Sequence, residues 1–464
     1  MKFKDIYIAF LLIFSLASCE KLVDDINEND PNTISNVNGR DLFIGIQLAD
    51  ISAQSAYLDW VSGIWCGYYV GSGRFEPIQN YQFADVNSNT PWGNIYQGVV
   101  KQVRELRSGI ELSNKDFFFG ASKVVEAHAL GTAANLFGDV PFTEAGNDEI
   151  SSPVYDAQAS VYANLQTLLD EAITDLTASG TTGGIVEDLF YGGDTNKWIA
   201  AAYTLKARLY MDVGDYGSAL SAAQQGINSA DATMAYSPPA VVGTGDINLL
   251  NSLATSATGV DLAVDGSFLI GLLGTDATSR NNGKTDEVDR YAFYYDGTEI
   301  NLNGIAKDDA PMKQISLEEN LLLWAEALLR TGGSNFGMAL QKLNEHRTNL
   351  RNGVYFAVTT GVYDDYVETD FDAGGIENVS GTISREDALL REIIEERYAT
   401  FFNQVLGFND LRRTKKDNPA IQVPVPFNAG AVHPERFLYP FTERNTNENT
   451  PAIEDIFTKT EINQ

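Results

Sequence analysis

The sequence has few of the residues on which disulfide-linked proteins and many enzymes depend. Its 464 residues include two cysteines and three histidines. Two cysteines exclude a disulfide framework, and three scattered histidines supply a metal site or a Ser-His-Asp triad poorly. Phosphate-binding loops, nucleophile elbows and dinucleotide fingerprints are also absent from the sequence. We therefore expect neither a catalytic site nor a bound metal or cofactor.

Positive charge is scarce as well. Lysine and arginine together number 32 against 63 acidic residues, and the formal net charge is −31. A chain of this charge repels nucleic-acid phosphates and anionic lipid surfaces, so neither is an expected partner. With 63 acids, carboxylate pairs are too easily found to indicate a glycoside hydrolase. The pairs Glu318–Glu319 and Glu395–Glu396 lie on predicted helices, where caps and solvated faces explain them.

The amino-terminal segment has the features of an export signal. A short charged start precedes an apolar run at 6–16, which is shorter than the roughly 20 residues that span a bilayer. Residues 1–18 are therefore predicted to be a signal peptide. The sequence "LASC", which ends at Cys19, resembles the lipobox of bacterial lipoproteins. This resemblance implies cleavage before Cys19 and lipid attachment to it, with 19–38 as a polar tether.

Helical periodicity dominates the remainder of the chain. Apolar residues recur at helical spacing in 90–110, 160–176 and 384–408, which predicts a mainly α fold. Ser316 and Glu319 have the spacing of a capping box. Strands are expected only in short pieces, and "DRYAFYY" (289–295) and "GVYFAV" (353–358) are the candidates.

Two segments resemble tetratricopeptide helix pairs, one near 197–228 and the other near 316–347. Each has a glycine at its turn, followed by small and apolar residues that suit a packed second helix. The pairs are separated by an insert at 231–312 that is rich in Gly, Asn, Ser and Asp. Long irregular inserts of this kind are usually functional or disordered.

Several motifs, in order along the chain, resemble conserved blocks of the SusD/RagB family of surface lipoproteins. They are "HALGTAANLFGDVPFTEA" (128–145), "KWIAAAYTLKARLYM" (197–211), "ISLEENLLLWAEALLRTG" (315–332), "LLREIIEERYATFFNQVLGFNDLRRT" (389–414) and "ERFLYPFTERNTNEN" (435–449). The resemblance implies one mainly helical ligand-binding domain over 39–464, built on a tetratricopeptide-like scaffold with long loop insertions.

The resemblance also implies a function. Such proteins sit on the outer membrane at the cell surface, bind extracellular oligosaccharide or polysaccharide, and deliver it to a SusC-type TonB-dependent transporter. They are not enzymes. Two alternatives stay open: a peptide-binding receptor of the same architecture, and a glycoside hydrolase.

Sugar binding requires aromatic rings for the C–H faces of a pyranose and polar groups for its hydroxyls. The richest stretch of this kind is 57–83, where aromatic residues lie among glycines. The candidate ligand-binding residues are Trp60, Trp65, Tyr68, Tyr69, Arg74, Phe75 and Tyr81. The alternative for Trp60 and Trp65 is that they pack at the end of the first helix and have a structural role. Tyr291 and Tyr295 are further candidates in the insert, and Tyr363 and Tyr366 in a later acidic loop.

Overall fold

The computed structural model describes residues 38–108, 112–239, 246–256, 259–453 and 455–464. Helices account for most of this part of the chain, and the strands in it are short and paired two by two. The predicted mainly α fold class is therefore confirmed. The predicted signal peptide, Cys19 and the tether up to residue 37 lie outside the described residues. Within the described ranges, no helix combines the length and the apolar character needed to cross a membrane.

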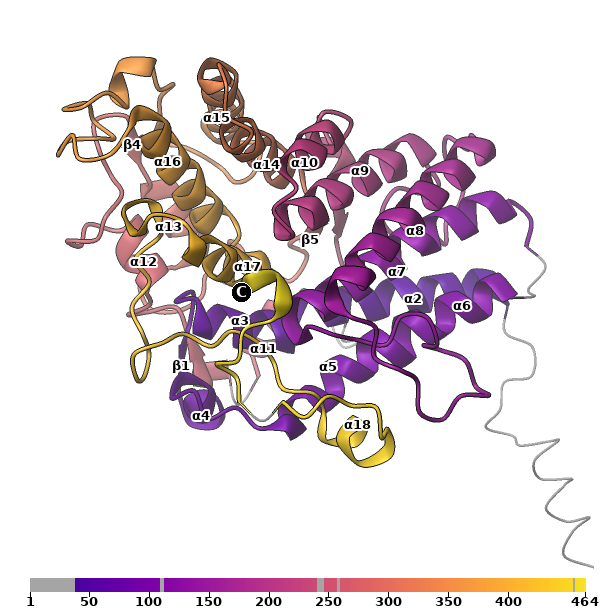
Figure 1. Cartoon of the computed structure of the whole chain (residues 1–464). Coiled ribbons are helices and arrows are strands. Elements are labelled where there is room, and N and C mark those ends of the chain that lie inside the picture. Colours follow the sequence, from indigo (N-terminus) through magenta and orange to yellow (C-terminus); the bar gives the residue numbers. More distant parts are fainter. Residues whose placement is uncertain (1–37, 109–111, 240–245, 257–258, 454) are drawn as a thin grey trace, which may run out of the picture.

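The first helices form a base that lies low in the view of Figure 1, below the helices that follow them in the chain. Helix α2 begins after Asn38, whose side chain accepts a hydrogen bond from the backbone N–H of Arg40. A π-helical segment, Asn94–Val100, joins the last two helices of this base. The elements of this base are α2 (Gly39–Ser55), α3 (Tyr57–Trp65), α4 (Glu76–Gln79), α5 (Asn89–Gly93) and α6 (Lys101–Ser108).

A stack of antiparallel helices follows, in which successive helices pack against each other (Figure 1). Gly214 and Gly332 make the turns of the two helix pairs, with φ angles of 78° and 72° that glycine adopts without strain. The stack consists of α7 (Lys115–Phe137), α8 (Gln158–Ser179), α9 (Thr195–Asp212), α10 (Tyr216–Ala223), α14 (Leu317–Arg330) and α15 (Phe336–Arg351).

The predicted capping box at the start of α14 is half formed. The Ser316 side chain accepts from the backbone N–H of Glu319 over 3.2 Å. The Glu319 carboxylate turns away from the cap and binds Arg208 of α9 through two hydrogen bonds of 2.5 and 2.7 Å. An ion pair between two buried side chains thus replaces the second half of the box and joins α14 to α9.

The segment between α10 and α14 contains short helices and strands. Its helices are α11 (Leu249–Ala254), α12 (Phe268–Leu273) and α13 (Val288–Tyr294). The strand pairs are antiparallel: β1 (Val70–Gly71) with β3 (Leu262–Ala263), β2 (Met234–Tyr236) with β5 (Met312–Ile315), and β4 (Thr285–Asp286) with β6 (Val362–Tyr363). The chain ends with α16 (Arg385–Thr400), α17 (Leu406–Arg413) and α18 (Phe441–Thr446).

Both predicted strand segments are corrected by the structure. Residues 289–295 form most of α13, and 353–358 form a turn and loop after α15. The aromatic composition of "DRYAFYY" is typical of a strand, but in the structure Arg290 and Tyr294 are buried four residues apart on one face of a short helix.

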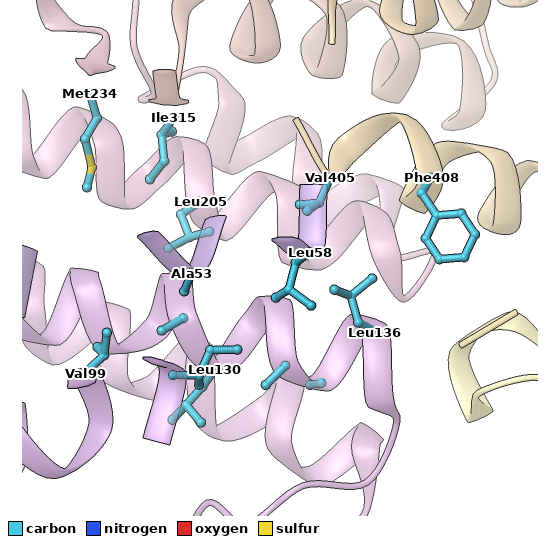
Figure 2. Close-up of a cluster of buried hydrophobic side chains, with 14 of the residues drawn as sticks. Ala53, Leu58, Val99, Leu130, Leu136, Leu205, Met234, Ile315, Val405 and Phe408 are labelled. Atoms are coloured by element: carbon cyan, nitrogen blue, oxygen red, sulfur yellow. The ribbon is translucent and has the colours of Figure 1, made fainter. Parts of the chain in front are cut away.

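The main hydrophobic core lies where the base meets the stack. Figure 2 shows side chains from α2, α3, α7, α9, α17 and the β2–β5 pair converging there. Burial of this apolar surface is the dominant stabilising term for the fold. Among the described residues, Cys66 is a free, buried thiol and forms no disulfide. A second core cluster joins α14, α15 and α16.

Candidate functional site

The aromatic residues predicted to bind a ligand at 57–83 are mostly turned inward. Trp65, Tyr68 and Tyr69 are at most 1% exposed. Trp65 Nε1 donates to the backbone carbonyl of Ile78 over 3.2 Å, and the Tyr68 hydroxyl donates to the carbonyl of Tyr398 over 2.8 Å. The expected aromatic surface on a loop is therefore corrected: these three rings belong to the core and present no face to a ligand in this structure.

Local backbone geometry explains this orientation. Residues 57–65 form α3, and the chain then folds back so that the N–H groups of Tyr68 and Tyr69 donate to the Gly63 carbonyl over 2.7 and 3.3 Å. The reversal directs both tyrosine rings at Phe402, with centroid distances of 5.8 and 5.1 Å. The glycines of this stretch permit a tight reversal, and the rings fill the space beneath it.

Of the remaining predicted ligand residues, two are buried and two are reached by solvent. Phe75 and Tyr81 are buried, and Tyr81 accepts a hydrogen bond from the backbone of Asn428 over 2.9 Å. Arg74 is exposed, and its guanidinium lies 5.2 Å from the Phe75 ring centroid. Trp60 is half-buried against the core. For Trp60 and Arg74, which solvent reaches, ligand binding stays a prediction.

The glycine-rich stretch supports another part of the molecule. The Gly67 carbonyl accepts a hydrogen bond from the N–H of Leu269 in α12 over 3.1 Å. Gly67 has a φ of 80°, and a Cβ there would lie 3.0 Å from Val425 and 3.1 Å from Phe268. The close approach, available only to glycine, fixes α12 at the edge of a cleft.

This cleft has a volume of about 840 Å³. It lies between α12 and α13, and it is walled by the loops that flank them and by Thr360. We call it the α12–α13 cleft. Its size is in the range of pockets that enclose a small ligand or a few units of a longer chain.

Two neighbouring tyrosines line the cleft. Tyr291 lies on α13, and Tyr295 directly follows the helix in an extended conformation; their rings meet edge to face with centroids 5.5 Å apart. The Tyr295 hydroxyl donates to Asp265 over 2.8 Å, which fixes its ring. Gly274 allows the other ring to approach, because a Cβ there would lie 3.3 Å from Tyr291 and 2.9 Å from the Ile270 carbonyl. Tyr291 is partly exposed and offers an aromatic surface to the cleft.

Carboxylates surround these rings. Asp265 and Asp276 are exposed, Asp286 is half-buried, and all three line the cleft. Burial, with Asp265 and Asp276 nearby, raises the pKa of Tyr291, and the hydrogen bond to Asp265 raises the pKa of Tyr295 to about 12. Both phenols are therefore neutral at physiological pH. The site suits uncharged, hydroxyl-rich ligands and repels anions.

A carboxylate on α13 fixes one wall of the cleft. Asp289 accepts hydrogen bonds from the backbone N–H groups of Thr359, Thr360 and Gly361, over 2.7, 2.9 and 2.7 Å. Burial works to raise the pKa of Asp289, but these hydrogen bonds outweigh it and the pKa lies below its ordinary value. The anion is thus held inside a ring of donors, and the loop carrying Thr360 stays beside the cleft.

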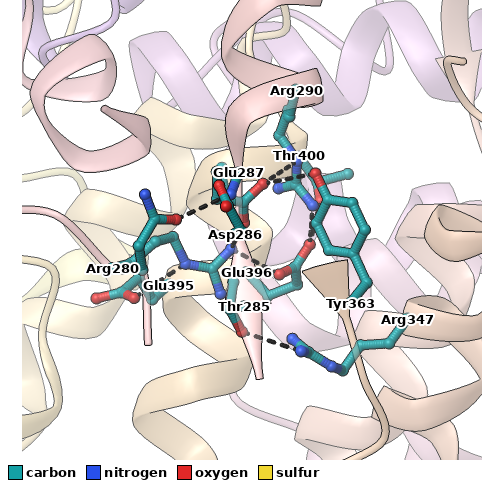
Figure 3. A network of polar contacts seen from close by, with 12 residues as sticks. Arg280, Thr285, Asp286, Glu287, Arg290, Arg347, Tyr363, Glu395, Glu396 and Thr400 are labelled. Atoms are coloured by element: carbon teal, nitrogen blue, oxygen red, sulfur yellow. Dashed lines mark hydrogen bonds and ion pairs between the residues drawn. The ribbon is translucent and has the colours of Figure 1, made fainter. Parts of the chain in front are cut away.

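Beneath the cleft lies a buried network of ion pairs, shown in Figure 3. Arg280 contacts Glu287 over 2.6 Å, Glu396 over 2.7 Å, Glu392 over 2.8 Å and Glu395 over 3.1 Å. Arg290 binds the same Glu396 over 2.6 Å. The network joins the segment carrying α13 to α16, so it sets the position of the cleft relative to the helical stack.

The network corrects the sequence-based interpretation of the glutamate pair on α16. Glu396 is fully buried, and Glu395 pairs with Arg280, so neither belongs to a solvated face. Burial opposes ionisation of Glu396, but Arg290 and Arg280 together hold its pKa well below the ordinary value. Burial raises the pKa of Glu392 well above its ordinary value, against the effect of Arg280. These carboxylates organise the structure.

The histidines have separate structural partners. His128 contacts Asp50 over 2.9 Å, and His346 contacts Glu396 over 2.9 Å. His433 lies beside the Val425 carbonyl, and burial lowers its pKa to about 4. No group of three or more histidine, cysteine, aspartate or glutamate side chains within the described ranges could hold a metal ion.

Of the predicted candidates, the structure brings only Tyr291 and Tyr295 together at this cleft. Tyr363 and Tyr366 are buried, with their hydroxyls bonded to Glu287 and Glu377. The sequence analysis missed the carboxylates of the cleft. The available signal was the concentration of Asp in the 231–312 insert, flanked by glycines at "DGSF" (265–268) and "LGTD" (273–276).

The fold and the cleft can be compared with known proteins. A family described as SusD-like, "Starch-binding associating with outer membrane", matches residues 31–240. A SusD/RagB family protein from Bacteroides thetaiotaomicron aligns over 89% of this chain and 95% of its own, with 19% identity and a TM-score of 0.63. Residues 31–240 are thus similar to the SusD-like family, and the chain as a whole shares the fold of solved SusD/RagB proteins. No curated protein matches it.

Further solved structures share this SusD-like fold. A chitin-binding SusD homologue from Flavobacterium johnsoniae aligns over 91% of this chain and 98% of its own, with 19% identity and a TM-score of 0.66. A SusD homologue from Bacteroides fragilis aligns over 92% of this chain and its entire length, with 16% identity and a TM-score of 0.67. At these identities the likeness concerns the fold, so the ligand has to be argued from this chain's own cleft.

Proposed function

We propose that this protein binds an extracellular oligosaccharide or polysaccharide in the α12–α13 cleft. The observation that carries the proposal is the arrangement of Tyr291 and Tyr295 on one wall of an open cleft whose rim bears Asp265, Asp276 and Asp286. An aromatic ring packs against the C–H face of a pyranose, and carboxylates accept hydrogen bonds from its hydroxyls. The starch-binding description of the family and the chitin-binding structural neighbour support a glycan ligand.

The second part of the proposal concerns location. Cleavage before Cys19 and lipidation of that residue would anchor the body, residues 39–464, to the outer membrane at the cell surface. Multiple acyl chains on one residue hold a protein stably at a membrane, whereas one chain binds marginally. The family's description as associating with the outer membrane supports this placement.

The third part concerns delivery and chemistry. The bound glycan would pass to a SusC-type TonB-dependent transporter, and the protein itself would not cleave it. Capture without cleavage accords with a cleft whose rings and carboxylates hold ligand hydroxyls, and with histidines that are engaged in structural contacts. The two alternatives, a peptide receptor and a glycoside hydrolase, are distinguished from this function by the experiment that follows.

The test is affinity gel electrophoresis of the mature, unlipidated protein in gels that contain soluble polysaccharides. We expect one polymer to retard migration, with no cleavage products in the gel. Tyr291→Ala should weaken retention by roughly tenfold, because the ring's contact with the sugar is lost. The matched control is Tyr210→Ala on α9, a partly buried tyrosine outside the cleft.

Each other outcome has a definite meaning. Retention that survives Tyr291→Ala would refute the assignment of the cleft. Absence of retention by every polymer, with binding to peptides in a calorimetric titration, would establish the peptide receptor instead. Cleavage products would establish a hydrolase. Anchoring and delivery are tested together by co-purification. We expect the lipidated protein to co-purify with a TonB-dependent transporter, and Cys19→Ala to abolish this co-purification.

A further inference from the structure

Three phenylalanines stand out among the described aromatic residues. Phe427, Phe441 and Phe457 are 51%, 52% and 40% exposed, whereas every described tryptophan and tyrosine is buried or half-buried. Two of the three contact one buried pair: the Phe427 ring centroid lies 4.6 Å from that of His433, and the Phe457 centroid 6.1 Å from that of Tyr81. We call Phe427 and Phe457, with Tyr81 and His433 beneath them, the Phe427 surface.

Hydrogen bonds beneath this surface hold the loop that carries Phe427. His433 Nε2 donates to the Val425 carbonyl over 3.1 Å, because a carbonyl only accepts. Burial lowers the pKa of His433 to about 4, so the ring is neutral at physiological pH and its Nδ1 accepts from the Tyr81 hydroxyl, 3.4 Å away. The same hydroxyl accepts from the backbone N–H of Asn428 over 2.9 Å. Both sides of Phe427 are thus tied to the body of the protein.

The backbone around the surface is also constrained. Tyr81 has a φ of 58°, a left-handed conformation that a bulky residue keeps only where the surrounding structure enforces it. Pro424 and Pro426 fix two backbone angles just before Phe427. The Phe427 ring is therefore held in solvent by a stiff loop, and a ligand that packs on it has little of the chain to order.

The exposed area suits a sugar chain better than a protein. Two phenylalanine side chains that are about half exposed offer roughly 200 Å² of apolar surface. A stable protein–protein interface covers about 800 Å² on each partner. A pyranose needs one aromatic face with polar groups nearby for its hydroxyls. Gln82 and Thr458 are exposed, follow Tyr81 and Phe457 directly in the sequence, and supply an amide and a hydroxyl.

The Phe427 surface adjoins one wall of the α12–α13 cleft. Val425, two residues before Phe427, and Phe268, the first residue of α12, both lie against Gly67. A Cβ at Gly67 would be 3.0 Å from Val425 and 3.1 Å from Phe268. Figure 1 shows the stretch between α17 and α18 passing beside α12. A glycan chain that extends from the cleft past α12 therefore reaches the loop that carries Phe427.

We propose that the Phe427 surface is a second contact site for the glycan chain that occupies the α12–α13 cleft. Phe427 and Phe457 pack against sugar rings outside the cleft, so the protein holds long polysaccharides more tightly than short oligosaccharides. Two linked contacts on one chain bind more tightly than either alone, because the second contact forms at high effective concentration. The inference rests on the proposed function, since it takes the glycan in the cleft as given.

The test compares polymers with their disaccharides on the full mature chain. The polymers, in affinity gels, are glycogen, hydroxyethylcellulose, xylan, laminarin and galactomannan. The disaccharides, in saturation-transfer difference NMR, are maltose, cellobiose, xylobiose, laminaribiose and mannobiose. Phe427→Ala should weaken retention by the bound polymer roughly three- to tenfold, because one ring contact is lost. The same variant should change the Kd of the matching disaccharide by less than about twofold, because the cleft is intact.

Phe441→Ala is the matched control, because it removes an equally exposed ring on α18, outside the Phe427 surface. It should leave both measurements unchanged. Phe457→Ala, on a separate loop, should act as Phe427→Ala does, and it decides the question if melting curves show that Phe427→Ala fails to fold. Polymer retention that is unchanged in both variants would overturn the proposal, and so would a disaccharide that is weakened as strongly as the polymer.

The two proposals fail separately. Polymer retention that is lost in Tyr291→Ala but unchanged in Phe427→Ala refutes the Phe427 surface and leaves the cleft in place. Retention that is weakened in Phe427→Ala but unchanged in Tyr291→Ala refutes the cleft and leaves the Phe427 surface as the glycan site. Absence of retention by all five polymers refutes both.

Discussion

Asp59 provides a sensitive test of how burial controls ionisation in this protein. It lies in α3, is 0% exposed, and neither of its carboxylate oxygens has a hydrogen-bond partner among the described residues. Burial alone raises its pKa well above the ordinary value. The native state therefore keeps a proton on Asp59 at pH values where the unfolded chain, with a pKa of about 3.9, has lost it.

The sign and size of the effect follow from this difference in bound protons. Between the unfolded and the native pKa of Asp59, the native state holds one more proton than the unfolded state. The contribution of Asp59 to stability is thus fully present below about pH 4 and is lost as pH rises, at up to about 1.4 kcal/mol per pH unit. Asp59→Asn removes the titration while nearly preserving the shape of the side chain.

The assay is urea unfolding, followed by tryptophan fluorescence, at a series of pH values from about 4 to 8. We expect the free energy of unfolding of Asp59→Asn, relative to the unmodified protein, to grow with pH by up to about 1.4 kcal/mol per unit. Asp116→Asn, at an exposed position of α7, is the control that removes the same charge. Parallel pH profiles for Asp59→Asn and the unmodified protein would show that native Asp59 is ionised and would refute the reasoning.

Three further substitutions test the packing and the ion pairs. Trp65→Ala should lower the free energy of urea unfolding by about 3–5 kcal/mol, and loss of glycan binding without loss of stability would restore Trp65 as a ligand residue. Arg280→Met leaves several buried carboxylates underpaired and should lower the free energy of urea unfolding by about 3–5 kcal/mol. Arg74→Met, at an exposed ion pair, should change this free energy by less than about 1 kcal/mol. Equal effects of the two substitutions would contradict the role of burial. Gly407→Ala should lower the melting temperature, because its Cβ would overlap a buried tyrosine ring. Gly45 lies in α2 with open space around it, so Gly45→Ala should leave the melting temperature unchanged or raise it. An unchanged melting temperature for Gly407→Ala would show that the ring moves aside.

Helices were the most predictable part of the fold. In α8, the apolar positions Val161, Leu165, Leu169, Ala172 and Leu176 are all buried. Such a stripe has one low-energy arrangement, with the apolar side against its neighbours, so periodicity alone identifies it. Ser316 caps α14 as predicted, because that bond needs only residues close in sequence, whereas Glu319 is drawn away by Arg208 from a distant helix.

The short elements of the insert were less predictable. The segment 289–295 has the aromatic composition of a strand but forms α13. Its helix is stabilised by contacts from distant parts of the chain: Arg290 pairs with Glu396, and Asp289 receives three backbone donors from 359–361. None of these contacts is visible in a local pattern of residues.

The candidate site was predicted least well. Aromatic density at 57–83 could not tell whether the rings point inward or outward. Trp65 and Tyr68 find partners in Ile78 and Tyr398 only after the chain has folded. The cleft itself combines two neighbouring tyrosine rings with carboxylates up to thirty residues away and with a threonine from the loop after α15.

Composition and periodicity were enough to predict the helical class of this protein, its net negative charge, its likeness to the SusD/RagB family and its small number of cysteines and histidines. These properties depend on composition and on patterns that repeat over a few helix turns. Which aromatic rings are buried, and where a cleft opens beside α12 and α13, follow only from the folded chain. Burial and pairing are properties of the neighbours that folding supplies, and those neighbours come from positions far apart in the chain.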